Sequence, residues 1–100
     1  MIPDTQLIRL SNPVRELRGT LAINGSKSIS NRALIALALA NAKPLDWLSN
    51  LSTSKDTTTL QSLLAHQGST FDAGDAGTTF RFLAAYLAMQ PGQQTLTGSP

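Results

Sequence analysis

Gly25-Ser26-Lys27-Ser28-Ile29-Ser30-Asn31-Arg32 is the stretch that decides the fold of this 100-residue chain. Two small residues precede a lysine, hydroxyl side chains follow, and an arginine stands before the apolar residues 33–40. This pattern predicts a loop that opens a helix, from about Ser28 to Ala40. A helix N-terminus exposes unpaired backbone N–H groups and partial positive charge. With Lys27 and Arg32 added, we expect a site for a small molecule with phosphate or carboxylate groups.

Ser28 and Arg32 are four residues apart and therefore share one face of the first helical turns. Ser28 can donate a hydrogen bond to an anion, and the guanidinium of Arg32 can reach a carboxylate on the same side. The alternative is that Ser26 or Ser28 only caps the helix, with Lys27 and Arg32 solvated. Residues 33–40 are apolar on every face, which predicts a buried helix. We favour the anion site because Arg32 abuts this apolar segment and needs a partner there.

A second loop, Gly74-Asp75-Ala76-Gly77, is expected to open another helix over residues 78–89. Gly77 has no side chain, so its backbone can approach a ligand closely. The alternative is that Asp75 or Thr78 caps the helix and Gly77 only makes the turn. The Asp75 carboxylate would disfavour a bound anion unless it caps the helix or is neutralised by a cation. If both loops face the same way, two positive helix ends converge on one site; Arg81 is expected to be structural.

The remaining pattern predicts short strands alternating with helices, which is typical of an α/β or α+β fold. Ser54 or Asp56 is expected to cap a further helix that runs to about Gln67, with Gly68 as its C-cap. Trp47, Phe71 and Tyr86 are expected in the core. The expected strands cover residues 7–10, 19–24, 44–51, 70–73 and 94–97.

The composition excludes several classes of function. The chain has no cysteine, so it has no disulfide, thiol nucleophile or cysteine-based zinc site. Its net charge of +2 comes from scattered cations, which argues against nucleic-acid binding. No segment is long enough to span a bilayer and no signal peptide is evident, so we expect a soluble, cytoplasmic protein. His66 is a lone histidine without a catalytic partner, and no metal-ligand cluster can be assembled.

Charged residues make up 14% of the chain, against about 25% in ordinary globular domains. Either another domain or a ligand covers part of the surface, or serine, threonine, asparagine and glutamine supply the polarity instead. Gly25-Ser26-Lys27-Ser28 superficially resembles a P-loop. However, a P-loop needs its glycine directly before the lysine and another five residues earlier. We therefore reject a nucleotide triphosphatase.

Four motifs together resemble the N-terminal part of the 5-enolpyruvylshikimate-3-phosphate synthase family. They are residues 25–34, Ser54-Lys55-Asp56-Thr57, Asp75-Ala76-Gly77-Thr78-Thr79-Phe80-Arg81 and Leu96-Thr97-Gly98-Ser99-Pro100. They follow the order of the family and cover most of the chain from Gly19 onward. The first motif is specific, because the sister enzymes that act on a UDP-sugar have Lys-Asn in place of Lys27-Ser28.

The resemblance implies transfer of the enolpyruvyl group from phosphoenolpyruvate to the 5-hydroxyl of shikimate 3-phosphate, with release of phosphate. This is a step of chorismate and aromatic amino acid biosynthesis and uses no metal or organic cofactor. By motif match, Lys27 would contact both substrates, and Ser28 and Arg32 would contact shikimate 3-phosphate. The backbone of Gly77 would contact phosphoenolpyruvate, with Asp75 as a weaker assignment. Besides these substrates, the implied partner is the remainder of the enzyme chain, with no nucleic acid or membrane.

The family fold is a two-domain inside-out barrel, and each domain contains three βαβαββ units. By resemblance, residues 24–100 would form the first unit of the substrate-binding domain, incompletely. Residues 1–23 would supply strands that cross to the opposite domain. No catalytic acid–base group is matched in this chain, so we expect it to be a segment of a longer enzyme and inactive alone. A non-catalytic anion-binding or oligomer-forming module remains the alternative.

Two departures from the family pattern lie close to the second loop. The family commonly has asparagine where this chain has Asp75, so an amide donor is missing beside the expected phosphoenolpyruvate site. Residues 68–74 also form a shorter stretch than usual, which predicts that strands preceding this loop are trimmed.

Overall fold

The computed structural model describes residues 6–99 as four helices and a two-stranded parallel sheet. Strand β1 is joined to β2 through α4, and Phe71 of β1 pairs with Leu96 of β2. Mixed helices and a parallel sheet confirm the α/β class at this coarse level. In chain order, the elements are α1 (Lys27–Leu39), α2 (Pro44–Trp47), α3 (Lys55–Leu64), β1 (Thr70–Asp72), α4 (Gly77–Ala88) and β2 (Thr95–Thr97).

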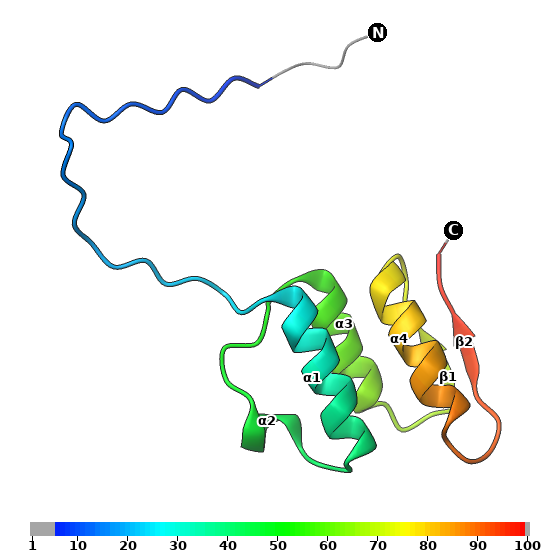
Figure 1. Cartoon of the computed structure of the whole chain (residues 1–100). Helices are drawn as coiled ribbons and strands as arrows, with labels where there is room; N and C mark the ends of the chain where they lie inside the picture. Colours follow the sequence, from blue (N-terminus) through cyan, green and yellow to red (C-terminus); the bar gives the residue numbers. More distant parts are fainter. Residues whose placement is uncertain (1–5, 100) are drawn as a thin grey trace, which may run out of the picture.

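The long helices α1, α3 and α4 lie side by side and begin at the same end of the molecule (Figure 1). The loop after β1 leads directly into α4, so the C-terminal end of β1 also reaches this end. Strand β2 is parallel to β1 and ends beside it. One end of the molecule therefore gathers three helix N-termini and the ends of both strands.

An apolar core lies between the three helices and the sheet. It consists of buried side chains from α1, α3, β1 and α4: Leu34, Leu60, Phe71, Leu83 and Leu87. Nearer the helix N-termini, besides the small Ala73 and Ala76, the buried side chains are polar: Ser30, Asn31, Ser52, Thr57 and Thr79. The helix bundle thus changes from apolar packing to hydrogen bonding towards the end where its helices begin.

Helix α1 starts and ends where the sequence predicts, and Asn41 follows it in the left-handed region with φ 56°. The prediction of a wholly buried helix is wrong. Ile29 is 70% exposed, whereas Ser30 and Asn31 are buried. The first turns of α1 face α3 through hydroxyl and amide groups, so this apolar side chain is turned outward.

The strand predicted over residues 44–51 is also wrong, because residues 44–47 form the short helix α2. Pro44 occupies the first turn, where its fixed φ and missing N–H suit a helix start. Trp47 is 73% exposed and is not part of the core. Gly68 is not a C-cap either, since α3 ends at Leu64 with Ala65 in the capping position.

Residues 6–24 run away from the helices as an extended arm without a strand (Figure 1). The strands predicted over residues 7–10 and 19–24 are therefore absent here. A strand needs a hydrogen-bonded neighbour, and the apolar side chains of the arm have none to pack against. Leu7 and Leu21 are more than 90% exposed. The radius of gyration of 18.7 Å, against about 13 Å for a compact chain of this length, reflects the arm. The predicted domain of residues 1–23 lies partly outside the described residues.

Candidate functional site

The N-terminus of α1 carries the cationic motif on its exposed surface. The Oγ of Ser26 accepts a hydrogen bond from the backbone N–H of Ile29 at 3.3 Å, so Ser26 is the N-cap. Ser28 is left free of that role. The guanidinium of Arg32 donates to the hydroxyl of Ser28, which confirms that these two side chains share a face. Within residues 6–99 Arg32 forms no ion pair, so its charge is available to an external anion.

Asp56 joins the first turns of all three long helices. Its carboxylate Oδ2 lies 2.9 Å from the Nζ of Lys27 on α1. Its backbone oxygen accepts a hydrogen bond of 2.6 Å from the hydroxyl of Thr79 on α4. Lys27 is therefore held by a partner and is not simply solvated. The N-termini of α1 and α4 are thus held close together, with the N-terminus of α3 between them, which confirms only that the two loops face the same way.

Buried hydrogen bonds inside the molecule hold the starts of the helices in place. The hydroxyl of Thr57 donates to Oδ1 of Asn31 at 2.8 Å, which links α3 to α1. The Oγ of Ser30 accepts from the backbone N–H of Ser52 at 2.9 Å. Buried hydrogen bonds are costly to break, because each lost partner leaves a desolvated group unpaired. The register of the three helix starts is thus set by polar contacts of defined geometry.

The N-terminus of α4 differs from the other two because no side chain caps it. Its N-cap is Ala76, and no capping hydrogen bond is formed. The alternative interpretation, in which Asp75 or Thr78 caps this helix, is therefore wrong. A Cβ built on Gly77, the first residue of α4, would meet nothing within 4 Å. The first turn of α4 is open, and its backbone N–H groups are not covered by a capping side chain.

Asp75 forms an ion pair instead. Its Oδ1 lies 2.6 Å from the Nζ of Lys55, the first residue of α3. The hydrogen bond from Lys55 and the attraction of its charge lower the pKa of the Asp75 carboxyl below its usual value. The Asp75 carboxylate is thus neutralised by a cation. This is one of the two arrangements expected from the sequence in which Asp75 would not disfavour a bound anion.

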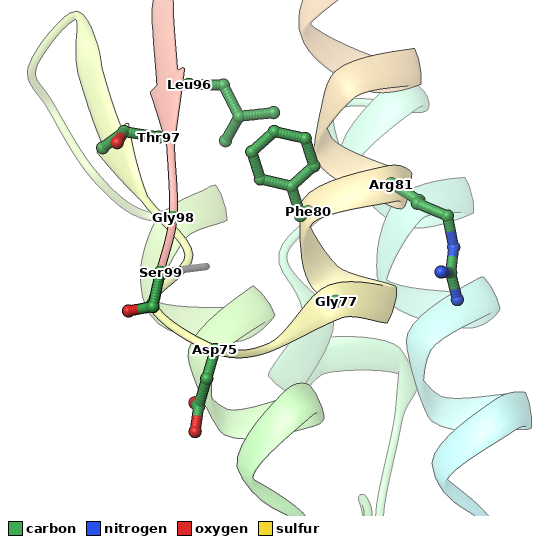
Figure 2. A pocket seen from close by; sticks show the side chains of 9 residues that line it. Asp75, Gly77, Phe80, Arg81, Leu96, Thr97, Gly98 and Ser99 are labelled. Carbon is green, nitrogen blue, oxygen red and sulfur yellow. The ribbon is translucent and has the colours of Figure 1, made fainter.

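An open groove lies between the start of α4 and the end of β2 (Figure 2). Phe80 of α4 and Leu96 of β2 face each other across it, whereas the carboxylate of Asp75 points away. Lys27, Ser28 and Arg32 do not line this groove. The structure brings the helix starts together but leaves two separate surfaces. The groove is lined by Gly74, Asp75, Gly77, Phe80, Arg81, Leu96, Thr97, Gly98 and Ser99.

A family model described as EPSP synthase (3-phosphoshikimate 1-carboxyvinyltransferase) matches residues 11–72. The chain belongs to the EPSP synthase family. Curated relatives named 3-phosphoshikimate 1-carboxyvinyltransferase agree. The protein from Bacteroides fragilis strain YCH46 is 44% identical over 84 residues, covering 84% of this chain and 20% of that protein. The protein from Shewanella loihica is 35% identical over 115 residues, covering 89% of this chain and 26% of that protein.

The chain spans about a fifth to a quarter of the length of these EPSP synthase relatives. The Shewanella alignment is longer than the 89% of the chain that it covers, so that relative contains residues which this chain lacks. The Bacteroides alignment shows no such excess. A trimmed stretch before Gly74 remains a prediction, because the alignments do not locate the difference. No solved structure matches the chain.

Sequence reasoning missed Asp56 and Thr79 as the residues that join the three helix starts of this chain. Asp56 was interpreted as helping to cap its helix, but Ser54 caps α3 by accepting from the backbone N–H of Thr57. The available signal was the motif Ser54-Lys55-Asp56-Thr57, which the resemblance had marked without a role. Its partner Lys27 lies 29 residues away, beyond the reach of local pattern.

Of the other candidate residues, Arg81 lines the groove, whereas His66 does not. His66 is exposed and packs edge-on against Phe71, with ring centroids 5.2 Å apart. Arg81 lies on α4 with a single long contact of 3.5 Å to the hydroxyl of Thr78. Among the residues that the structure describes, no cluster of metal-ligating side chains is found. No helix of the described part is long and apolar enough to cross a membrane.

Proposed function

We propose that this chain forms part of the substrate-binding wall of an enzyme that transfers the enolpyruvyl group of phosphoenolpyruvate to the 5-hydroxyl of shikimate 3-phosphate, releasing phosphate. The proposal rests on the chain's membership of the EPSP synthase family. The observation that carries it is the junction at Asp56, which brings the N-termini of α1 and α4 together. Both substrates are polyanions, and helix N-termini with added cations suit them.

The residue roles divide between two surfaces, the exposed start of α1 and the groove beside the start of α4. Ser28 and Arg32 bind shikimate 3-phosphate through a hydroxyl and a guanidinium that already contact each other. Gly77 offers its backbone N–H to phosphoenolpyruvate, with Asp75 beside that site. Lys27 lies at the junction between the two helix starts and contacts both substrates. Asp56 holds the ammonium group of Lys27 in place, and the positive charge of this group stabilises the negative charge of the two substrates during the transfer.

In the same proposal, residues 24–100 form the first, incomplete βαβαββ unit of the substrate-binding domain. Residues 1–23 pair with the opposite domain of the whole enzyme. Their described part carries exposed apolar side chains, with Leu10 90% exposed and Leu17 84% exposed, which supports a partner contributed by the remainder of the enzyme. No cofactor is required, and the catalytic groups lie outside this chain.

The roles of Lys27 and Arg32 are tested in a protein of the relatives' length that carries this sequence. Lys27→Ala or Arg32→Ala should lower kcat/KM for shikimate 3-phosphate by at least about 2 kcal/mol of transition-state binding. Ile29→Ala is the matched control, because Ile29 is an exposed side chain in the same turns of α1. Turnover within about twofold of the parent enzyme would contradict the assigned roles.

A titration of the chain itself separates this proposal from a non-catalytic anion-binding module. Shikimate 3-phosphate should shift the amide signals of residues 26–32, and phosphoenolpyruvate should shift that of Gly77. Inorganic phosphate at the same concentration is the control. Equal shifts with any phosphate, spread over all three helix N-termini, would favour the alternative.

A further inference from the structure

Residues 72–77 are two consecutive Asp-Ala-Gly triplets, and the structure treats them differently. In the first triplet, Oδ1 of Asp72 accepts a hydrogen bond of 2.9 Å from the backbone N–H of Gly74, two residues on. This is the usual local bond of an aspartate in a turn. In the second triplet, Asp75 stands at the same spacing from Gly77. Its Oδ1 is bound to Lys55 instead, at 2.6 Å.

We propose that Lys55 is a positioning residue that holds the Asp75 carboxylate away from the N-terminus of α4 and so keeps the N–H of Gly77 open to an external anion. The inference rests on the proposed function, because it takes the start of α4 as the phosphoenolpyruvate contact. It adds a reason for Lys55, to which neither the motif match nor the family assignment gives a role.

The geometry of the loop carries the argument. No side chain caps α4, although Asp75 is one residue before its N-cap and has the right spacing to close a turn onto Gly77. A carboxylate is attracted to a helix N-terminus, so some contact must compete for it. The ion pair with Lys55 is that contact. Figure 2 shows the Asp75 carboxylate pointing away from Gly77 and the groove.

The charge balance points the same way. Both side chains are largely exposed, at 72% for Lys55 and 62% for Asp75, and exposed ion pairs contribute little to folding. The consequence for the groove is larger. Asp75 lines the groove in which Gly77 lies, so a released carboxylate would both occupy the helix N-terminus and repel a phosphate. Lys55 removes both obstacles.

The test is a double-mutant cycle in the chain with Lys55→Gln, Asp75→Asn and the double variant. The probe is phosphoenolpyruvate, followed through the amide signal of Gly77. Lys55→Gln should weaken binding about fivefold, the scale of one charge moved to a helix N-terminus. Asp75→Asn should bind phosphoenolpyruvate at least as tightly as the parent, and in the double variant it should restore the affinity lost with Lys55. Lys43→Gln is the control, because it makes the same charge change at another exposed lysine.

A ligand-free readout keeps this inference separate from the proposed function. In Lys55→Gln, the pKa of the Asp75 carboxyl should rise, because the hydrogen bond and the charge of Lys55 that lower it are lost. The chemical shift of the Gly77 amide should then depend on pH and follow the titration of that carboxyl. Neither change should occur in Lys43→Gln. If phosphoenolpyruvate leaves the Gly77 signal of the parent chain unshifted, the proposed function fails while the switch of Asp75 is still measured.

Two results would overturn the inference. A double variant that binds as weakly as Lys55→Gln would mean that Lys55 acts by itself, through direct contact with the ligand. A Gly77 amide that does not respond to the Asp75 carboxyl in ligand-free Lys55→Gln would mean that the released side chain does not reach the helix N-terminus.

Discussion

The N-termini of α1 and α4 each carry a glycine, and the two glycines are there for different reasons. A Cβ on Gly25 would lie 1.9 Å from the backbone oxygen of Asn50, an impossible contact. A Cβ on Gly77 would meet nothing within 4 Å, and Gly77 does not have a positive φ. The fold itself explains Gly25. No contact within residues 6–99 requires Gly77, whereas in the proposed function its bare backbone leaves room for phosphoenolpyruvate.

The largest expected effect is that of Gly25→Ala. The loop before α1 crosses the backbone at Asn50, which also donates from its side chain to the backbone oxygen of Ile23 at 3.3 Å. A methyl group at position 25 must push these two backbones apart. We expect a loss of about 3 kcal/mol in the free energy of unfolding, the upper range for overpacking. Urea denaturation followed by the helical circular dichroism signal measures it.

Gly19→Ala is the control for this prediction, because Gly19 lies in the extended arm with nothing within 4 Å of its Cβ position. It should leave the free energy of unfolding unchanged. If Gly25→Ala and Gly19→Ala gave the same midpoint and slope, the close crossing at Asn50 would not exist in solution.

The next effect concerns the buried hydrogen bond between Thr57 of α3 and Asn31 of α1. Thr57→Val keeps the shape of the side chain but leaves Oδ1 of Asn31 buried without its donor. The expected cost is about 2 kcal/mol, since an unpaired buried acceptor keeps its full desolvation penalty. Denaturation in urea, compared with Thr58→Val on the exposed side of α3, measures the difference. Equal stability of the two variants would contradict a structural role for the buried bond.

The sequence predicts the two helix starts well and their junction poorly. Helix α1 and helix α4 are confirmed to within about a residue, because apolar spacing, small residues before the helix and a following stop signal are local. The contact of Asp56 with Lys27 is not local, and Asp56 also has a simpler role as an acid near a helix start. Periodicity alone assigned α1 an apolar buried face. It could not show that Asn31 would be buried through a partner 26 residues away.

The predicted strands are absent where the segment has no neighbouring strand to pair with. Residues 70–73 and 94–97 were predicted as strands and pair with each other as β1 and β2. Residues 7–10 and 19–24 have comparable apolar alternation but no neighbour, and they remain an extended arm. Residues 44–51 begin with Pro44, which fits a helix start as well as a strand. A strand is a property of two segments, so one segment's pattern predicts it only in part.

The smallest expected effect on stability, and the sharpest on binding, is that of Gly77→Ala. Alanine favours a helix over glycine by up to about 1 kcal/mol, and less at a first position. The variant should therefore be at least as stable as the parent chain. Its methyl group would stand at the open start of α4, where we place phosphoenolpyruvate. Amide shifts on titration should show weaker binding of phosphoenolpyruvate, with shikimate 3-phosphate binding at residues 26–32 unchanged. A variant that is more stable and also binds phosphoenolpyruvate as tightly as the parent would remove the ligand as the reason for Gly77, and with it the contrast between the two glycines.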